Sequence, residues 1–462
     1  MLKVLSPYDE HLIKEIPTQD KKDAEEMLQT AQRLFEDRRH WLPAYQRVKI
    51  LEQVLYLMQQ QETRLATEAA EEGGKPLIDS KVEAARAIQG VKIAIEHLNG
   101  HLHGVEIPMG ITPSTANRKA FTMREPRGPV CAVSAFNHPL NLIVHQVIPA
   151  IATGCPVIVK PASSTPLSCL NLVNILYEAG LPREWCQVLV TNSAVAEKVV
   201  CDPRIRFFSF IGSGKVGWYL RAKLAPGTSC TLEHGGAAPV IIEPDADIDA
   251  AIPVLVKGGF YHAGQVCVSV QRVYVEQSQA NDVANAMAKL ASKLIVGDPV
   301  DPKTEVGPLI ARSEVERVDK WVKEAIKKGA QVLCGAEKIS ETCYAPTVLL
   351  DPPEDVALSQ NEIFGPVVCV YSYQDRDEAI RRANQLPFAF QAAVFTRSLD
   401  AAFDVVQRLN ANTVMVNDHT AFRADWMPFG GRLESGMGVG GIGQTMHEMT
   451  FEKLMVLKSL AF

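Results

Sequence analysis

The chain has 462 residues, more than one hydrophobic core usually supports, so two or three domains are expected. Its net charge of -6 gives no basic footprint for nucleic acid, although it leaves room for a local basic pocket. The start of the chain shows no export signal, and no apolar segment is long enough for a membrane span, so we expect a cytoplasmic protein without a nucleic-acid or membrane partner.

The first hundred residues are predicted to be mainly helical. Apolar residues recur every three or four positions over 20–38, 42–70 and 75–102, with charged residues between them. The pattern then changes, because residues 120–129 are strand-like and rich in turn residues. We interpret this segment as part of a β excursion away from the main domain.

From Gly128 onward, short apolar strands alternate with helical segments, and a second such series follows Gly236. This alternation favours parallel, doubly wound sheets, so the expected fold class is α/β. The closing residues 450–459 are strand-like, have no evident local partner, and are predicted to pair with another subunit. Strands are expected at 130–136, 156–160, 185–190, 206–211, 238–242, 272–275, 331–333, 367–371, 392–395 and 413–417.

A glycine-rich loop, Gly212-Ser-Gly-Lys-Val-Gly217, follows one of these strands and opens a helical segment. It matches the Gly-x-Gly-x-x-Gly dinucleotide signature, in which glycines allow close approach and a helix N-terminus binds diphosphate. The general rule for this signature makes Glu233, about 20 residues on, a ribose ligand. The pattern of the loop alone leaves that interpretation of Glu233 open.

Seven motifs in a fixed order carry a resemblance to a known family. The chain resembles the NAD(P)-dependent aldehyde dehydrogenase superfamily over essentially its whole length. The resemblance implies two doubly wound α/β domains, one cofactor-binding and one catalytic, with a small β oligomerisation extension. The motifs are Phe136-Asn137-His138-Pro139, Lys160-Pro161-Ala162-Ser163, the loop 212–217, Glu233-His234-Gly235-Gly236, Gly264-Gln265-Val266-Cys267, Glu362-Ile-Phe-Gly-Pro366 and Pro428-Phe-Gly-Gly431.

The resemblance also assigns the catalytic roles. A free thiol with a pKa of about 8.5 is mostly protonated, so Cys267 needs a base or electropositive surroundings before it attacks the aldehyde. The Asn137 amide and the Cys267 N–H would stabilise the resulting oxyanion, and loss of hydride to the nicotinamide leaves a thioester. Glu233 would activate the water that hydrolyses the thioester, and this role replaces the interpretation of Glu233 as a ribose ligand.

The cofactor implied by the resemblance is NAD or NADP. Lys160 would hydrogen-bond a ribose, Ser213 would lie near the diphosphate, Glu362 would contact the other ribose, and Phe364 would pack beside the nicotinamide. Ser163 stands where NAD-preferring relatives carry a glutamate that repels a 2′-phosphate, and we therefore expect acceptance of NADP alongside NAD. The cofactor-binding set is Phe136, Lys160, Ser163, Gly212, Ser213, Gly217, Glu362 and Phe364.

The substrate pocket is expected to be polar. His138, Asn141 and His145 follow Asn137 at helical spacing, and Arg423 lies in the loop before Pro428. Histidines and an arginine suit a short polar or anionic aldehyde of the sulfolactaldehyde, phosphonoacetaldehyde, succinate semialdehyde or lactaldehyde type. Arg423 as an exposed loop residue is the alternative. His234 replaces the leucine usual after the general base, and the sequence leaves open whether it merely packs or influences Glu233 or the cofactor.

The expected domain ranges are 1–110 with 130–235 for the cofactor, 236–436 for catalysis, and 111–129 with 437–462 for assembly into a homodimer or homotetramer. Ten cysteines without a Cys-x-x-Cys pair predict reduced thiols, and the histidines lack metal-ligand spacing. Two alternatives remain. A CoA-acylating relative is disfavoured by Glu233, and a non-catalytic homologue is disfavoured because Cys267, Glu233, Asn137, Lys160 and Glu362 are all present.

Overall fold

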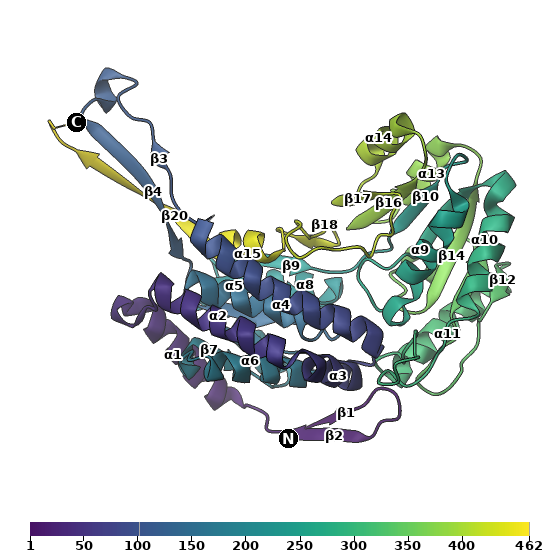
Figure 1. Ribbon diagram of the computed structural model, residues 1–462, viewed down its shortest axis with the longest axis horizontal. Helices are drawn as coiled ribbons and strands as arrows, with labels where there is room; N and C mark the ends of the chain where they lie inside the picture. Colours follow the sequence, from purple (N-terminus) through teal and green to yellow (C-terminus); the bar gives the residue numbers. More distant parts are fainter. Residues whose placement is uncertain (101, 462) are drawn as a thin grey trace.

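The computed structural model describes residues 1–100 and 102–461, so residues 101 and 462, which fall in two of the expected domain ranges, lie outside the described residues. Two helix-covered sheets form separate bodies, and a narrow ribbon of strands projects from one of them (Figure 1). Each body has its own buried apolar cluster. The expected α/β class is confirmed.

The first body is a six-stranded sheet in the order β19-β9-β8-β5-β6-β7, parallel except at β19. Its strands are short, and β5, β6 and β8 are mostly apolar and buried, as expected for strands with helices on both faces. The strands are β5 (Val130–Val133), β6 (Val157–Lys160), β7 (Cys186–Val188), β8 (Phe207–Ile211), β9 (Ser229–Glu233) and β19 (Gly436–Met437). The helices are α1 (Lys21–Glu36), α2 (Ala44–Gln60), α3 (Glu62–Gly73), α4 (Leu77–Gly100), α5 (Asn141–Thr153), α6 (Leu167–Glu178), α7 (Ser193–Val200), α8 (Gly214–Arg221) and α15 (Ile442–Glu448).

The second body is a seven-stranded sheet in the order β12-β13-β14-β11-β10-β16-β17, in which only the edge strand β12 is antiparallel. Its strands are β10 (Pro239–Ile242), β11 (Arg272–Glu276), β12 (Gln331–Cys334), β13 (Thr347–Leu350), β14 (Val367–Tyr373), β16 (Gln391–Phe395) and β17 (Thr413–Val416). Its helices are α9 (Ile248–Phe260), α10 (Gln277–Ala291), α11 (Arg312–Lys327), α12 (Ala357–Gln360), α13 (Arg376–Ala383) and α14 (Leu399–Arg408).

The projecting ribbon consists of β3 (Glu106–Ile107), β4 (Arg118–Pro126) and β20 (Thr450–Lys458). The expectation that the closing strand lacks a local partner is wrong, because β20 pairs antiparallel with β4 along its whole length, from Thr450–Pro126 to Lys458–Arg118. The expected ranges already placed both strands in one extension, but strand patterns more than three hundred residues apart do not show that the two pair with each other.

Two segments lie differently from the expected domain ranges. The ribbon already begins at β3, and α15 packs on α4 and α5 in the first body rather than in the ribbon. The apolar side chains of α15, Ile442 and Met446, explain this, because they complete the first apolar cluster. The domain ranges themselves stay a prediction.

Two further antiparallel pairings are β1 (Leu2–Leu5) with β2 (Leu12–Ile16) and β15 (Phe388–Ala389) with β18 (Arg432–Leu433). Among the described helices, none is both long and apolar enough to cross a membrane.

The topology places the functional motifs at one junction. The carboxyl ends of β5, β8 and β9 lead into Ser134–Asn137, Gly212 and Glu233, and parallel strands bring their carboxyl ends to one edge of a sheet. In the second body, Cys267 and Glu362 precede β11 and β14, at the amino ends of their strands. The site therefore forms where these two edges face each other.

Candidate active site

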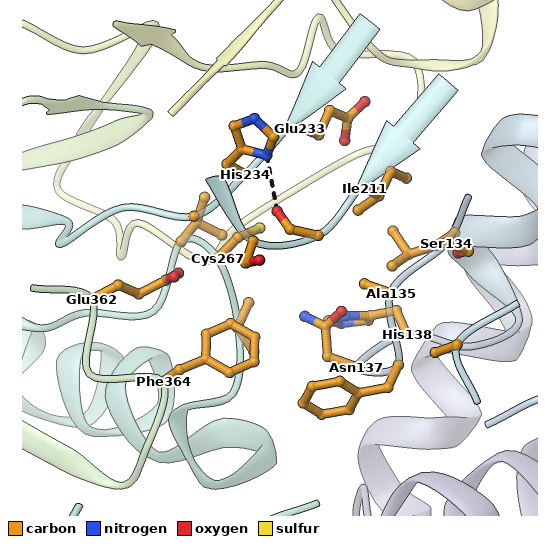
Figure 2. Close-up of a pocket in the computed structure, with 18 of the residues that line it drawn as sticks. Ser134, Ala135, Asn137, His138, Ile211, Glu233, His234, Cys267, Glu362 and Phe364 are labelled. Atoms are coloured by element: carbon orange, nitrogen blue, oxygen red, sulfur yellow. Dashed lines mark hydrogen bonds between the residues drawn. The ribbon is translucent and has the colours of Figure 1, made fainter. Parts of the chain in front are cut away.

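A cavity of about 530 Å³ lies at this junction. Figure 2 shows Glu362 and Phe364 on one side of it, Asn137 and Ser134 on the other, and Cys267 between them. Four sequence-predicted residues, Lys160, Ser163, Gly217 and His145, do not line it. The cavity wall does include Phe136, Asn137, His138, Asn141, Gly212, Ser213, Glu233, Cys267, Glu362, Phe364 and Arg423.

Cys267 lies at the end of a strained and anchored turn. The preceding residues His262 and Ala263 have left-handed φ angles of 49° and 53°, which cost about 1–2 kcal/mol each in non-glycine residues. Gln265 holds the turn in place, because its side chain donates to the Pro308 carbonyl at 3.1 Å and accepts from the Ile310 N–H at 2.9 Å. Contacts with the surrounding structure therefore hold the thiol of Cys267 in one position.

The resting thiol of Cys267 is protonated. Burial, reinforced by the carboxylates of Glu362 and Glu233, raises its pKa to about 12, while Arg423 acts in the opposite direction. The thiolate is the nucleophilic form, so attack on a carbonyl requires that a proton leave the sulfur. Arg423 is a cation positioned to favour that loss.

Asn137 is buried, and hydrogen bonds hold both its side chain and its backbone. Its side-chain Nδ2 donates to the Gln265 carbonyl at 2.9 Å, two residues before Cys267. An amide nitrogen carries two hydrogens, so one of them is available to another acceptor beside the thiol. The backbone carbonyl of Asn137 accepts from Lys75 at 3.1 Å. The arrangement suits a fixed oxyanion donor.

Glu233 ends strand β9, with its carboxylate against Gly440. A Cβ atom on Gly440 would lie only 1.9 Å from Glu233 Oε1. No side chain in the described ranges hydrogen-bonds to this carboxylate. Burial raises its pKa to about 7, opposed by Arg423, so a substantial fraction is an ionised base at neutral pH.

Glu362 has the features of a ligand-binding carboxylate. Burial raises its pKa to about 8, opposed by a backbone hydrogen bond from Gly236 and the charge of Arg317. Its Oε1 has no partner among the described residues and lies so close to Gly235 that a Cβ there would be 1.6 Å away. An orphaned buried acceptor beside a glycine fits a bound hydroxyl group.

The glycine loop offers free backbone donors to an anion. Ser213 caps α8 without a side-chain hydrogen bond, which leaves the first N–H groups of the helix open toward the cavity. Phe136 and Phe364 meet edge-to-face at 5.8 Å across the cavity. Together with Glu362, these residues fit a nicotinamide dinucleotide, with the phosphates at the loop and the aromatic rings near the reacting end.

His234 packs against the glycine loop. Its ring lies 5.6 Å from the rings of both Phe210 and Trp218, and burial lowers its pKa, so it is neutral. Its Nδ1 donates to the Gly212 carbonyl at 2.9 Å, the dashed line in Figure 2. A Cβ on Gly217 would lie 2.0 Å from His234 Cε1. Gly217 therefore makes room for His234 instead of facing the cavity.

Lys160 and Ser163 lie outside the cavity wall. Lys160 ends β6, where its Nζ donates to the Pro161 carbonyl at 3.0 Å and burial lowers its pKa. Ser163 is exposed in the following turn. Their cofactor roles stay a prediction, and the position of Lys160 at the carboxyl edge of the first sheet is compatible with it.

Asp425 organises the substrate side of the site. Arg86 donates two hydrogen bonds to its carboxylate, at 2.9 and 3.0 Å, and Asn141 and His145 donate at 3.2 and 2.8 Å. Burial alone would raise the pKa of Asp425, but these hydrogen bonds and the charge of Arg86 hold it below its usual range. His145 is thus a second layer behind Asn141, not a wall residue as predicted.

The side chain of Arg423 is only 9% exposed, so the alternative of an exposed loop residue is wrong. Its Nη2 donates to His145 Nδ1 at 3.3 Å, its guanidinium lies 3.5 Å from the centre of the Phe429 ring, and its Nε has no partner among the described residues. The nearest Asp425 oxygen is 3.8 Å from Nε, beyond a hydrogen bond. Burial and then Arg86 lower the pKa of Arg423, the expected effect on a cation without full compensation.

His138 is neutral and pairs with Tyr261 instead of Asp425. Burial holds its pKa well below the usual range, and its Nε2 pairs with the Tyr261 hydroxyl. Sequence reasoning missed Arg86 and Asp425. A usable signal was present for Arg86, since Asp79, Glu83 and Arg86 are charged residues at helical spacing, which places them on one face of the helix. In the described part of the chain, no cluster of side chains could hold a metal ion.

Comparisons with known proteins agree with this geometry. The model of the Aldehyde dehydrogenase family matches residues 1–455. The 3-sulfolactaldehyde dehydrogenase of Priestia aryabhattai is 34% identical over 457 residues, covering 99% of this chain and 94% of that protein.

Two solved structures share the fold along the chain. Aldehyde dehydrogenase 21 from Physcomitrella patens, in complex with the reaction product succinate, has a TM-score of 0.95 at 34% identity and covers 99% of this chain and 95% of its own. Glyceraldehyde-3-phosphate dehydrogenase GapN from Methanocaldococcus jannaschii, complexed with NADP, has a TM-score of 0.94 at 34% identity and covers 99% of both chains.

Proposed function

The chain belongs to the aldehyde dehydrogenase family, and on this basis we propose that its substrate is a short aldehyde with an anionic group at the end remote from the carbonyl. The enzyme oxidises small aldehydes with NAD or NADP through a thioester on a cysteine, as the family does. The observation that supports the anionic class is Arg423, whose Nε has no hydrogen-bond partner among the described residues.

We assign the catalytic steps to three residues. Cys267 releases its thiol proton to solvent, and its sulfur then attacks the carbonyl carbon. The oxygen that becomes negative accepts hydrogen bonds from Asn137 Nδ2 and the Cys267 N–H. NAD(P)+ supplies the hydride acceptor that makes the reaction an oxidation. Cys267 then carries the acyl group as a thioester. Glu233 takes a proton from water, the hydroxide adds to the thioester carbon, and the acid leaves as the C–S bond breaks.

The cofactor would be held by both edges of the site. The N–H groups of Ser213 and Gly214 at the start of α8 suit the diphosphate, with Gly212 allowing close approach of the backbone, and the orphaned Glu362 carboxylate suits a ribose hydroxyl. Phe136 and Phe364 would flank the nicotinamide end. Gly217 supports the loop through His234, and Lys160 and Ser163 are proposed for the adenosine side.

Charge decides the substrate class. The substrate side holds two cations, Arg86 and Arg423, the carboxylates of Asp425 and Glu233, and a neutral His145. Asp425 hydrogen-bonds to Arg86 and lies 3.8 Å from Arg423, so Arg423 has no carboxylate hydrogen-bonded to it among the described residues. A bound carboxylate, sulfonate or phosphonate would supply that hydrogen-bonded counter-charge. The relatives named for sulfolactaldehyde, for a succinate product and for glyceraldehyde-3-phosphate support the same class.

Arg423→Met is expected to lower kcat/KM for succinate semialdehyde about 10- to 100-fold relative to kcat/KM for butanal, the neutral aldehyde of equal chain length. A charge-assisted hydrogen bond contributes about 1.5–3 kcal/mol, which corresponds to this range. The ratio cancels any effect that loss of Arg423 has on Glu233, because that effect is common to both substrates. Steady-state NAD(P)H formation is the measurement.

The exposed Arg432, which donates only to the Ala411 carbonyl, gives the matched control Arg432→Met. This variant should leave the substrate ratio within about twofold, as for most surface substitutions. A wild-type enzyme most active on long aliphatic or aromatic aldehydes, or an Arg423→Met variant with an unchanged ratio, would contradict the anionic class.

Cofactor preference gives a second prediction. Ser163→Glu should lower kcat/KM with NADP about tenfold or more and leave kcat/KM with NAD nearly unchanged, because a carboxylate repels a 2′-phosphate and accepts from a ribose hydroxyl. Lys215, exposed on the glycine loop, would add attraction for the phosphate in the wild type. A wild-type preference for NAD by several orders of magnitude would exclude acceptance of NADP.

Assembly into a homodimer or homotetramer is proposed from β20. This edge strand exposes Phe451, Leu454, Met455, Val456 and Leu457, and an exposed apolar edge strand normally requires a cover. A molecular mass in solution equal to one chain of 50.6 kDa would contradict the proposal. Cytoplasmic location stays a prediction.

A further inference from the structure

Three charged residues on one face of α4 contact three different parts of the site. Asp79 pairs with Lys257 of α9 at 2.6 Å, Arg86 pairs with Asp425, and Glu83 pairs with Lys75 in the turn before α4. The first two pairs reach the second body and the substrate side. The pair of Lys75 and Glu83 reaches Asn137, and the proposed catalytic steps do not involve either residue of this pair.

Lys75 is fully buried, which is rare for lysine unless the charge is paired. Its Nζ forms an ion pair with the Glu83 carboxylate and also donates to the Asn137 backbone carbonyl at 3.1 Å. The turn that carries Lys75 packs against the segment that anchors the thiol loop, because Gly74 touches Pro308, whose carbonyl accepts from Gln265. Lys75 therefore lies where Asn137 and the Cys267 turn meet.

Glu83 holds the other end of the Asn137 segment. Its Oε1 accepts from the backbone N–H groups of Leu140 and Asn141, both at 2.9 Å, at the start of α5. These N–H groups have no intrahelical partner, so the carboxylate acts as the cap of α5. One buried ion pair thus clamps residues 137–141 from both sides, through the carbonyl of Asn137 and the first turn of the following helix.

We propose that Lys75 and Glu83 are positioning residues that hold the Asn137 amide in line for the oxyanion. The inference rests on the proposed role of Asn137 in catalysis. Neither side chain lines the cavity, so neither touches the substrate.

A preorganised donor must be held to within about 0.5 Å of its working position, and its neighbours supply that constraint. An apolar pair of the same volume would avoid the desolvation cost of two buried charges. Such an apolar pair could not donate to the Asn137 carbonyl or accept from the N–H groups at the start of α5. These two contacts explain why a lysine and a glutamate occupy the two positions.

The test uses Lys75→Met and the double variant Lys75→Met/Glu83→Gln. The double variant removes both charges, so it can still be assayed if Lys75→Met fails to fold because Glu83 is left buried and unpaired. Each should lower kcat/KM for aldehyde about 10- to 100-fold, the size expected for misplacing a catalytic group. Alkylation of Cys267 by iodoacetamide, in which the sulfur displaces iodide and no oxyanion forms, should stay within twofold of wild type. NAD(P)H binding, followed by its fluorescence, should also stay unchanged.

A double-mutant cycle separates positioning from a general structural role. In an Asn137→Ala background, adding Lys75→Met should change kcat/KM less than twofold, because the amide to be positioned is gone. Glu72→Gln is the matched control, since Glu72 is an equally buried carboxylate that accepts from the Leu167 and Ser168 N–H groups at the start of α6. It should lower stability without a selective loss of aldehyde turnover.

An equal loss from Lys75→Met in both backgrounds, a parallel loss of alkylation rate, or no loss in the wild-type background would overturn the positioning role while leaving the catalytic assignment of Asn137 intact. Full activity of Asn137→Ala alone would instead remove the oxyanion assignment, and the positioning role with it. The two failures are therefore distinguishable.

Discussion

Replacement of Cys267 by alanine is expected to lower kcat for aldehyde oxidation by at least about 10⁴-fold. The residue supplies the sulfur on which the acyl group is carried, and loss of a covalent nucleophile typically removes this much or more of the rate. The remaining site would still bind cofactor, because the proposed ligands Glu362, Gly212 and Ser213 are unchanged. NAD(P)H formation under saturating aldehyde is the measurement, with cofactor binding followed separately.

The other nine cysteines supply the control for this experiment. Cys334 is half-buried on the edge strand β12, away from the cavity, and Cys334→Ala should retain full turnover. Among the described cysteines, only Cys267 lines the main cavity. A Cys267→Ala enzyme that still oxidised aldehyde at a rate near wild type would contradict the thioester mechanism for this chain.

Glu233→Gln is expected to lower steady-state turnover about 10²- to 10⁴-fold while leaving the first turnover intact. Glutamine has a similar shape but cannot take a proton from water, so the acyl group should remain on Cys267. We expect a burst of about one NAD(P)H per active site, followed by slow turnover. Mass spectrometry of the quenched protein should show the acyl group on the peptide containing Cys267.

The same residue sets a pH dependence of known sign. Burial raises the pKa of Glu233 to about 7, and only the ionised carboxylate acts as a base. Where hydrolysis of the thioester limits turnover, kcat should therefore rise with pH through about 7 and fall about tenfold per pH unit below it. Glu233→Gln should lack this acidic limb, because the substituted amide does not titrate.

Three outcomes would contradict the role of Glu233. Loss of the burst together with the steady state would place Glu233 in the step before the thioester, where it would deprotonate Cys267. Turnover that is insensitive to Glu233→Gln but increases with added CoA would instead indicate transfer of the acyl group to a thiol. Unchanged turnover without CoA would leave another residue as the base.

Much of the candidate site could be predicted from local sequence. Cys267, Glu233 and Asn137 stand in short motifs whose order along the chain is specific, and all three line one cavity. Strands such as β5 and β8 were also predictable, because a short apolar run is buried on both faces of a parallel sheet. Local patterns misjudged β20, since a strand does not specify its partner.

Contacts between distant residues escaped prediction. Arg86 and Asp425 are 339 positions apart, and nothing in either segment says that they meet. Gly217 matched a phosphate-binding signature, yet in the fold its missing side chain accommodates His234. In the sequence, Lys75 and Glu83 resemble the ordinary surface charges of a helical region, although both are buried in the structure.

The sequence by itself determined the family, the α/β class and the residues proposed to carry out the reaction, because motif order and apolar periodicity are local properties of the chain. Only the tertiary structure decided which charges are buried and which groups neighbour them. That distinction follows from burial, since a charge in solvent is indifferent to its partners, whereas a buried charge such as Arg423 or Lys75 is stable only beside particular ones. The anionic substrate class proposed from Arg423 and the proposed support of Asn137 therefore rest on packing.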